Sequence, residues 1–377
     1  VGELISDVSE ATRVQTAMSR WDYLFTQFRV IVTYIRLLLF PVGQNLDYDY
    51  PLYHSFFSPP VFLSFLVLAA ILSFGMYLFR YRKLVPHTRL ISFGILWFFV
   101  ALSVESSFIP IEDVIYEHRM YLPSVGMFIA VMTSLFLVRD HFKQVGKIII
   151  PSCVVIAITL ASATYARNIV WQSEVALYRD VVRGSPLKAR GHNDLGNAYM
   201  DQNRLDEAVQ EFITALKLNP DYAMAHYNLG NAYMDQNRLD EAVQEFITAL
   251  KLNPDDATAY YNLGNAYGKL NRLDEAIIEY KAALSMKPDY TDVYNNLGVA
   301  YLTQNRLDEA IHEFITALKL NPDDADAHYN LGAAYLKQDR LDEAIHEFIT
   351  VLKLKPDDTE ARNNLEICYE RMKTMIR

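Results

Sequence analysis

The densest group of reactive side chains lies in residues 105–126, ESSFIPIEDVIYEHRMYLPSVG, between two apolar stretches. Glu117, His118 and Arg119 are consecutive there, and Glu112 and Asp113 stand a few residues before them. A guanidinium can hold a phosphate with two parallel hydrogen bonds, and an imidazole can donate a hydrogen bond or a proton. The segment therefore predicts a site for the phosphate of a lipid-linked molecule at the membrane surface. A salt bridge that only anchors the loop is the alternative.

Two further arginines, Arg29 and Arg36, could supply a second phosphate contact. The sequence contains no nucleophile triad, no glycine-rich phosphate loop and no His/Cys cluster with metal-ligand spacing. Its two cysteines exclude a disulfide framework. No catalytic residue can be named from these patterns, no metal site is expected, and no cofactor is evident.

Asparagine recurs at a fixed spacing in the second half of the chain. Its amide offers two hydrogen-bond donors and an acceptor, so a row of such side chains can hold a peptide backbone irrespective of its sequence. The alternative is that these residues only bond neighbouring helices to one another. The candidates are Asn228, Asn262, Asn296 and Asn330, together with Asn197, Asn231 and Asn265.

Four apolar segments in the first half approach the length of about 17 to 25 helical residues that crosses a bilayer. They span residues 61–79, 91–109, 121–138 and 148–165. The second contains Glu105 followed by two serines, so its last turn is expected in the interface. A buried helix of a soluble core would explain any one segment. Four in succession predict four transmembrane helices over residues 59–166.

The distribution of Lys and Arg in the short loops predicts the orientation of these helices. Basic residues cluster after the first and third segments, whereas the loop between the second and third is acidic. Both ends of the chain are therefore expected outside the cytoplasm. The basic residues are Arg80, Arg82, Lys83, Arg89, Arg139, Lys143 and Lys147.

Residues 20–41 are apolar in bulk but contain three arginines. An arginine at the bilayer centre is costly, so we expect an amphipathic helix in the outer interface, with its arginines near lipid headgroups. A fifth span is the alternative. The following QNLDYDYP predicts an exposed acidic turn with Asp47 and Asp49. Residues 1–58 thus form a predicted interfacial and extracytoplasmic segment, and the polar start at Val1 leads us to expect preceding residues in the natural protein.

The second half repeats with a period of 34 residues, marked by Pro220, Pro254, Pro288, Pro322 and Pro356. Within each unit the apolar residues fall at helical spacing, first in a helix A and then in a helix B. Each proline ends helix B, and the aspartate after it can cap the next helix A. The pattern predicts five helical hairpins over 187–356, after a linking helix at 167–186 and before a capping helix at 357–377.

The order LG, Tyr, Ala, an aromatic residue, Ala and Pro at these spacings resembles the tetratricopeptide (TPR) signature. The resemblance implies an all-α fold in which transmembrane helices precede an α-α superhelix, and a concave groove that binds extended polypeptide. The recurring asparagines resemble the ladder in the TPR groove of O-GlcNAc transferases. Residues 187–377 carry 20 basic and 32 acidic side chains, a net charge of −12, which excludes nucleic acid as a partner.

The order of features along the chain also resembles the C-terminal part of transmembrane and TPR-containing O-mannosyltransferases and their bacterial relatives. The features are the IPI-x-D…EHRMYLPS-x-G loop, the RN-x-x-W-x-S-E motif and the repeats; the motif comprises Arg167, Asn168, Trp171, Ser173 and Glu174. The resemblance implies a glycosyltransferase of the GT-C class, which transfers a sugar from a polyprenyl-phosphate donor to a polypeptide outside the cytoplasm. These enzymes carry their catalytic carboxylates in the first extracytoplasmic loop, so the resemblance implies that the catalytic residues lie outside these 377 residues.

We therefore expect an integral membrane protein in contact with lipid, whose extracytoplasmic repeats bind polypeptide and which forms the C-terminal part of a polyprenyl-phosphate-sugar-dependent protein glycosyltransferase. One alternative is a non-catalytic, membrane-tethered TPR scaffold, and another is a cytosolic TPR adaptor in the reversed topology. The short spans and nearly uniform repeats favour a bacterial inner membrane, although the endoplasmic reticulum fits the same topology.

Overall fold

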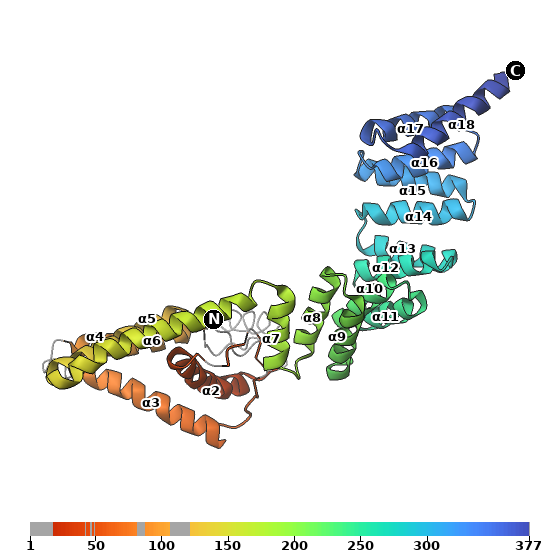
Figure 1. Cartoon of the computed structure of the whole chain (residues 1–377). Coiled ribbons are helices and arrows are strands. Elements are labelled where there is room, and N and C mark those ends of the chain that lie inside the picture. Colours follow the sequence, from red (N-terminus) through yellow and green to blue (C-terminus); the bar gives the residue numbers. More distant parts are fainter. Residues whose placement is uncertain are drawn as a thin grey trace, which may run out of the picture. The chain divides into compact units, whose positions relative to one another are not determined.

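The computed structural model describes residues 18–41, 43–45, 47–48, 50–80, 87–105 and 121–376. Every regular element in these residues is a helix, so the predicted all-α fold is confirmed (Figure 1). The contacts divide the chain into two compact units, Val1–Gly191 and His192–Arg377. The first unit holds the apolar helices, and the second holds the repeats.

Three helices of the first unit are long and apolar enough to cross a membrane. They are α3 (Pro59–Arg80), α5 (Tyr121–His141) and α6 (Lys143–Val170), and they correspond to the first, third and fourth apolar segments. The second segment forms α4 (Thr88–Glu105), whose apolar part, Thr88–Ser103, is shorter. Consecutive helices pack against one another (Figure 1). The apolar stretch of α6 is not buried within the described structure, as expected of a helix that faces lipid.

Small residues let α4 approach both of its neighbours closely. A Cβ on Gly94 would lie 2.3 Å from the carbonyl oxygen of Gly126 on α5, and a Cβ on Gly75 of α3 would lie 2.7 Å from the side chain of Ile95. The hydroxyl of Ser92 donates to the carbonyl oxygen of Gly75 at 2.9 Å. Such close contacts and interhelical hydrogen bonds hold helices together in lipid, where burial of apolar surface gives little driving force.

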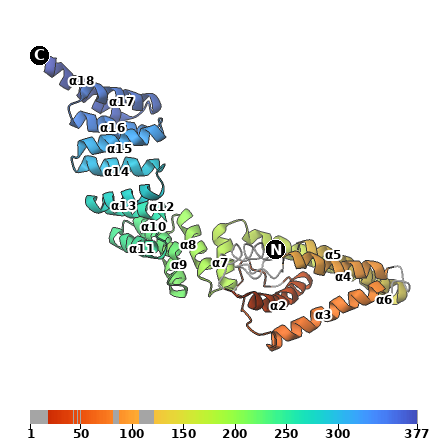
Figure 2. The ribbon, with the colours of Figure 1, turned by 180° about the vertical axis from the view of Figure 1, so that it is seen from behind.

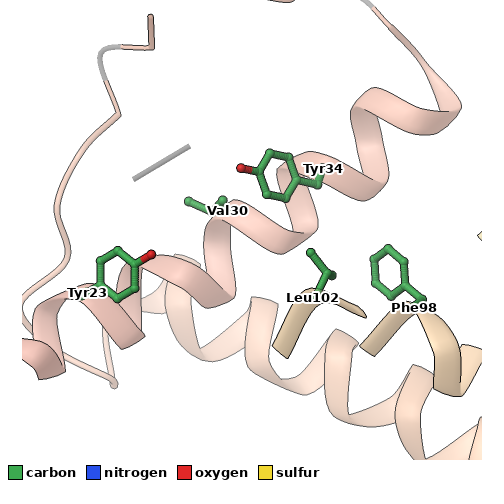
Figure 3. Close-up of a cluster of buried hydrophobic side chains, with 5 residues drawn as sticks. All are labelled: Tyr23, Val30, Tyr34, Phe98 and Leu102. Atoms are coloured by element: carbon green, nitrogen blue, oxygen red, sulfur yellow. The ribbon is translucent and has the colours of Figure 1, made fainter. Parts of the chain in front are cut away.

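The helix α2 (Arg20–Leu39) precedes these helices and buries one face against them. Ser19 caps its first turn, because its hydroxyl accepts a hydrogen bond from the backbone N–H of Asp22 at 3.1 Å. The buried cluster between α2 and α4 consists of Tyr23, Val30, Tyr34, Phe98 and Leu102 (Figure 3). The α2 members are spaced by seven and four residues and so share one face.

The segment after α2 contacts α7 (Glu174–Gly184), the helix that follows α6. The side chain of Asn45 is buried and donates a hydrogen bond to the hydroxyl of Ser185 at 2.7 Å. The approach is close enough that a Cβ on Gly184 would lie 2.6 Å from the amide nitrogen of Asn45. A glycine at the end of α7 therefore makes room for this contact.

Asp47 extends the same junction with two ion pairs. Its side chain pairs with Lys188 and with Arg190, the latter at 3.0 Å, and the residue is 7% exposed. The prediction of an exposed acidic turn is therefore wrong at Asp47. Its partners lie 141 and 143 residues later in the chain, so no pattern within the segment could reveal them. Asp49 lies outside the described residues.

The second unit is a series of helical hairpins (Figure 2). The A helices are α8 (Ala189–Asp201), α10 (Ala223–Asp235), α12 (Ala257–Lys269), α14 (Thr291–Thr303) and α16 (Ala325–Lys337). The B helices are α9 (Leu205–Leu218), α11 (Leu239–Leu252), α13 (Leu273–Met286), α15 (Leu307–Leu320) and α17 (Leu341–Leu354), and α18 (Thr359–Ile376) follows them. Each A-to-B turn contains one residue with positive φ, a conformation that Asn and Asp tolerate. These residues are Asn203, Asn237, Asn271, Asn305 and Asp339.

The two helices of each hairpin meet where a glycine faces an aromatic ring. A Cβ on Gly230 would lie 2.7 Å from the ring of Phe246, which is fully buried. The glycine of each LG pair is therefore needed for close approach of the helices. The same contact recurs as Gly196–Phe212, Gly264–Tyr280, Gly298–Phe314 and Gly332–Phe348.

A glutamate of helix B faces helix A in each hairpin, and its partner varies along the array. Nδ1 of His226 lies 2.5 Å from a carboxylate oxygen of Glu245. The same pair occurs as His192–Glu211 and His328–Glu347. Tyrosine replaces this histidine in the third and fourth hairpins. Burial there raises the pKa of Glu279 and of Glu313.

We expect Gly230→Ala to destabilise the array by about 1–3 kcal/mol, because the added Cβ must displace the ring of Phe246. Gly268→Ala is the matched control. Its Cβ would meet only the hydroxyl of Tyr280, at 3.6 Å, and Ala is favoured over Gly inside a helix by about 0.8 kcal/mol. Denaturant unfolding followed by circular dichroism measures both changes. Equal stability of the two variants would show that close approach does not explain the LG glycine.

We expect Glu279→Gln to raise the thermal unfolding midpoint at neutral pH. Because the folded state raises the pKa of Glu279, its stabilising contribution is full below the unfolded value, about 4.5, and is lost as pH rises through the folded value. A neutral amide does not lose this contribution, so the increase of the unfolding midpoint over that of wild type should grow from about pH 4 to about pH 7. Glu245→Gln, which gives up the ion pair with His226, is the control. A gain that does not change with pH would contradict the assignment.

Candidate functional site

The loop that carries Glu117, His118 and Arg119 lies outside the described residues. The predicted phosphate contacts that can be placed are Arg29 and Arg36, both on α2. Among the residues that the structure describes, no group of three or more His, Cys, Asp or Glu side chains is arranged to hold a metal ion. The membrane-side candidate site is therefore built on α2.

Residues 50–56 fold back along α2 and hold its position. The hydroxyl groups of Thr33 and Tyr50 share a hydrogen bond of 2.9 Å. Nearer the start of the helix, Nδ1 of His54 lies 3.0 Å from a carboxylate oxygen of Asp22, and this hydrogen bond lowers the pKa of the Asp22 carboxyl. The returning segment is thus tied to α2 on either side of Arg29.

Arg29, Thr33 and Arg36 lie on successive turns of α2, beside Tyr50. Burial raises the pKa of the Tyr50 phenol, whereas the hydrogen bond with Thr33 and the positive charges of Arg29 and Arg36 act in the opposite direction. Both guanidinium groups therefore lie close enough to Tyr50 to stabilise negative charge at its hydroxyl group. Both guanidinium groups would stabilise an anionic ligand at this position.

Among the arginines of the first unit that the structure describes, Arg29 differs from the others in the state of its Nε atom. This atom is buried and has no hydrogen-bond partner among the described residues. A buried donor without a partner costs about 1–3 kcal/mol, a cost that an acceptor able to reach this atom would remove. A guanidinium presents its N–H groups in one plane, a geometry that matches the oxygen atoms of a phosphate.

The asparagines of the A helices form hydrogen bonds that cross from one repeat to the next. Nδ2 of Asn262 donates to Oδ1 of Asn231 at 2.9 Å and to the hydroxyl of Tyr227 at 3.0 Å. Asn296 donates in the same way to Asn265, at 2.9 Å. The two acceptors of Asn262 are four residues apart, so a single amide bridges one turn of the preceding A helix.

Two repeats use a different acceptor. Asn228 donates to Asn193 at 2.9 Å, and Asn330 donates to Asn295 at 3.0 Å. Asn197 is exposed and makes no described hydrogen bond through its side chain. Sequence reasoning missed Asn193 and Asn295. A signal was present for Asn295, because the position before each ladder asparagine of the second to fifth repeats is Tyr or Asn.

The hydrogen-bond donors of the ladder match the hypothesis that these residues bond neighbouring helices. The side-chain oxygen atoms of the same asparagines behave differently from these donors. Among the described contacts, nothing donates to Oδ1 of Asn228, Asn262, Asn296 or Asn330. The ladder therefore presents free carbonyl oxygens along the A helices. Its role in holding a peptide stays a prediction.

Comparison with known proteins identifies the repeats. The family described as TPR repeat matches residues 196–236, 230–271 and 269–305, and the family described as Tetratricopeptide repeat matches residues 295–365. The predicted TPR array is thereby confirmed. Among solved structures, the crystal structure of YrrB, described as a TPR protein with an unusual peptide-binding site, is 24% identical. The match covers 49% of this chain and 96% of that chain, with a TM-score of 0.45.

The chain is also homologous to proteins named protein O-mannosyl-transferases. It is 27% identical to TMTC1 of Mus musculus over 212 residues, which cover 53% of this chain and 22% of the mouse protein. It is 27% identical to F38B6.6 of Caenorhabditis elegans over 123 residues, which cover 31% of this chain and 17% of that protein. The chain thus spans about a fifth of the length of these relatives.

We expect Asn262→Ala to destabilise the array by about 1–3 kcal/mol, because it removes two hydrogen bonds and leaves Oδ1 of Asn231 without this donor. Asn197→Ala is the matched control, since an exposed side chain without a described bond should change stability by less than about 0.5 kcal/mol. Denaturant unfolding of both variants gives the comparison. If Asn262→Ala is as mild as the control, the ladder does not bond the repeats together.

Proposed function

We propose that this chain, a membrane-associated TPR protein related to the protein O-mannosyl-transferases, is part of a protein glycosyltransferase that uses a polyprenyl-phosphate sugar. In this proposal the repeats bind the acceptor polypeptide and the first unit helps to bind the donor. The relation to the named enzymes supports the reaction class. The observation that carries the donor role is the buried Nε of Arg29, which has no partner among the described residues.

The phosphate of the donor would lie against Arg29, Arg36 and the hydroxyl of Tyr50. A partly buried cation interacts with an anion more strongly than an exposed one does, because less water screens the pair. The burial that raises the pKa of Tyr50 keeps its phenol protonated, so it can donate a hydrogen bond to a phosphate oxygen.

The polyprenyl chain of the donor needs an apolar path close to α2. A cavity of about 350 Å³ lies between α2, α3, α4 and α5 and is lined almost entirely by apolar side chains. Its lining includes Ile35, Phe74, Ile95, Phe98 and Met127. Ile35 immediately precedes Arg36, so the apolar cavity begins beside the cationic face of α2. An anionic headgroup joined to an isoprenoid chain matches this arrangement, in which a cationic surface is followed by an apolar cavity.

The acceptor polypeptide would lie along the A helices. An extended peptide carries one N–H donor per residue, except at proline, and the ladder asparagines present free carbonyl oxygens to such donors. The net charge of −12 over residues 187–377 disfavours acidic polypeptides and favours neutral or basic ones.

In the proposed topology, α2 and the repeats lie outside the cytoplasm. Arg80 ends α3, Arg89 lies at the start of α4, and Arg139 lies in the last turn of α5. These cations therefore gather at one end of the antiparallel helices, which the positive-inside rule assigns to the cytoplasm. A bacterial inner membrane is the proposed location.

We expect Arg29→Ala to reduce kcat/KM for sugar transfer from a polyprenyl-phosphate sugar by about tenfold to a hundredfold, the value of a lost charge-assisted hydrogen bond. Arg20→Ala is the matched control, because Arg20 is exposed at the first turn of the same helix. The assay uses membranes from cells that express the intact natural gene, with radiolabelled donor and a polypeptide acceptor.

Equal activity of the Arg29→Ala and Arg20→Ala proteins would remove Arg29 from the donor site. If the wild-type protein transfers no sugar but retains polypeptide on its repeats, the chain belongs to a membrane-tethered scaffold and the proposed function is wrong.

A further inference from the structure

A second cavity, of about 870 Å³ and with both polar and apolar lining, lies where α6 is followed by α7. The RN-x-x-W-x-S-E motif forms this junction: Arg167 and Asn168 lie in the last turn of α6, Trp171 is its C-cap, and α7 begins at Glu174 after Ser173. The remaining walls come from the residues that follow α2 and from the start of α5. No residue of this motif belongs to the donor site proposed at Arg29, Arg36 and Tyr50.

The polar wall of the cavity is electrically balanced. Arg167 forms an ion pair with Asp180 of α7 and donates to the backbone carbonyl oxygen of Gln44 at 3.2 Å. A guanidinium has five N–H groups and a carboxylate has two oxygen atoms, so both partners keep hydrogen-bonding capacity for a ligand. Asn168 and Gln44 also line the cavity, and their amides are further hydrogen-bond donors and acceptors.

Trp171 supplies the apolar surface beside these polar groups. It is 53% exposed although it lines the cavity, so part of its ring is available to a ligand. A flat aromatic ring next to paired polar side chains suits a molecule with one apolar face and a polar edge. A pyranose ring has this character, because its C–H groups gather on its faces and its hydroxyl groups project from its edge.

We propose that this cavity binds the ring of a neutral hexose, with one face against Trp171 and with hydroxyl groups bonded to Arg167, Asp180 and Asn168. A phosphate is disfavoured here because Asp180 already neutralises Arg167. The apolar helix α6 ends at Val170, so the cavity lies where the chain leaves the membrane. A sugar attached to a lipid and a sugar attached to a polypeptide can both reach this depth. The inference rests on the proposed function only for the identity of the carrier, and not for the binding of the sugar.

A purely structural explanation makes the opposite prediction. The ion pair would then only join α6 to α7, and Trp171 would only anchor the protein at the membrane surface, as aromatic residues often do. Neither task involves saturable binding of a soluble sugar. Binding therefore distinguishes the two explanations, whereas stability does not.

The test measures binding of methyl hexopyranosides of gluco, manno and galacto configuration to the whole chain in lipid nanodiscs that contain no glycolipid. Saturation-transfer NMR reports which ring protons touch the protein, and a titration gives the affinity. We expect saturable binding of at least one methyl hexoside. Trp171→Ala should weaken it by about fivefold or more, while Trp171→Phe should keep most of it. Trp21→Phe, at an exposed tryptophan of α2 outside the cavity, should leave it unchanged.

Thermal unfolding of each variant establishes that it is folded. Should Trp171→Ala unfold, Asn168→Ala takes its place, since the Asn168 side chain is exposed and should lose affinity without loss of the fold. The inference is overturned if no methyl hexoside binds saturably, if binding survives in the folded cavity variants, or if inorganic phosphate displaces the sugar.

Two further ligands identify the carrier. A short-chain prenyl-phosphoryl hexose that binds more tightly than the methyl hexoside supports a donor sugar, and a hexosylated threonine peptide that does so supports a sugar already on the polypeptide. If the natural protein transfers no sugar but binds sugar in a way that depends on Trp171, the proposed function is refuted and the sugar site is supported. Transfer without such binding refutes the site alone.

Discussion

A polar side chain that leaves water must find a partner, and this constraint fixes the joints between the helices of this protein. In the first unit, Asn45 and Asp47 lose almost all contact with solvent because the residues at the end of α7 and just after it supply their partners. In the repeats, one asparagine amide satisfies its donors on the preceding A helix. The hydrogen bonds are specific in direction, so each sets the register of two helices that apolar packing alone would leave free to slide. The unpartnered Nε of Arg29 is an exception to this rule.

The hairpins of the repeats could be predicted from the sequence because their contacts are local. The expected caps of the A helices are wrong by one residue, since α12 and α16 are capped by Asp256 and Asp324 and not by the aspartate directly after the proline. Gly230 and Phe246 meet within one hairpin, and Asn237 needs only its own turn to adopt positive φ, so a period of 34 residues carries this information. The first unit could be predicted only as far as its apolar segments. The ion pairs of Asp47 join residues more than 140 positions apart, and a charged residue among tyrosines looks the same in the sequence whether it is exposed or buried. The same limit applies to Arg167, whose partner Asp180 comes from the next helix.

Charge balance separates two arginine sites that the sequence alone would treat alike. Arg29 has no carboxylate partner among the described residues and lies beside the Tyr50 phenol, on the same helix as Ile35, which lines the apolar cavity. Arg167 shares its charge with Asp180, beside an exposed tryptophan. The first set of groups suits a phosphate on an isoprenoid, and the second suits an uncharged ring with hydroxyl groups. A polyprenyl-phosphate sugar contains both parts, so the proposed donor accounts for two sites whose chemistry differs. Neither site requires the other to be correct.

The ladder has a consequence for the polypeptides that the repeats can hold. Because the side-chain N–H groups of Asn262 and Asn296 donate to the preceding A helix, a peptide held at these two residues would meet their side-chain oxygens as acceptors. An acceptor row pairs with backbone N–H groups, which every residue but proline possesses, so such binding tolerates most sequences and weakens where prolines interrupt the row of donors. Side-chain charge then provides the remaining discrimination, because an array of net charge −12 repels acidic segments at low salt and loses that preference as salt is added. Under the proposed function, recognition of many unstructured polypeptides would follow from the half of each of these amides that the neighbouring helix leaves unused.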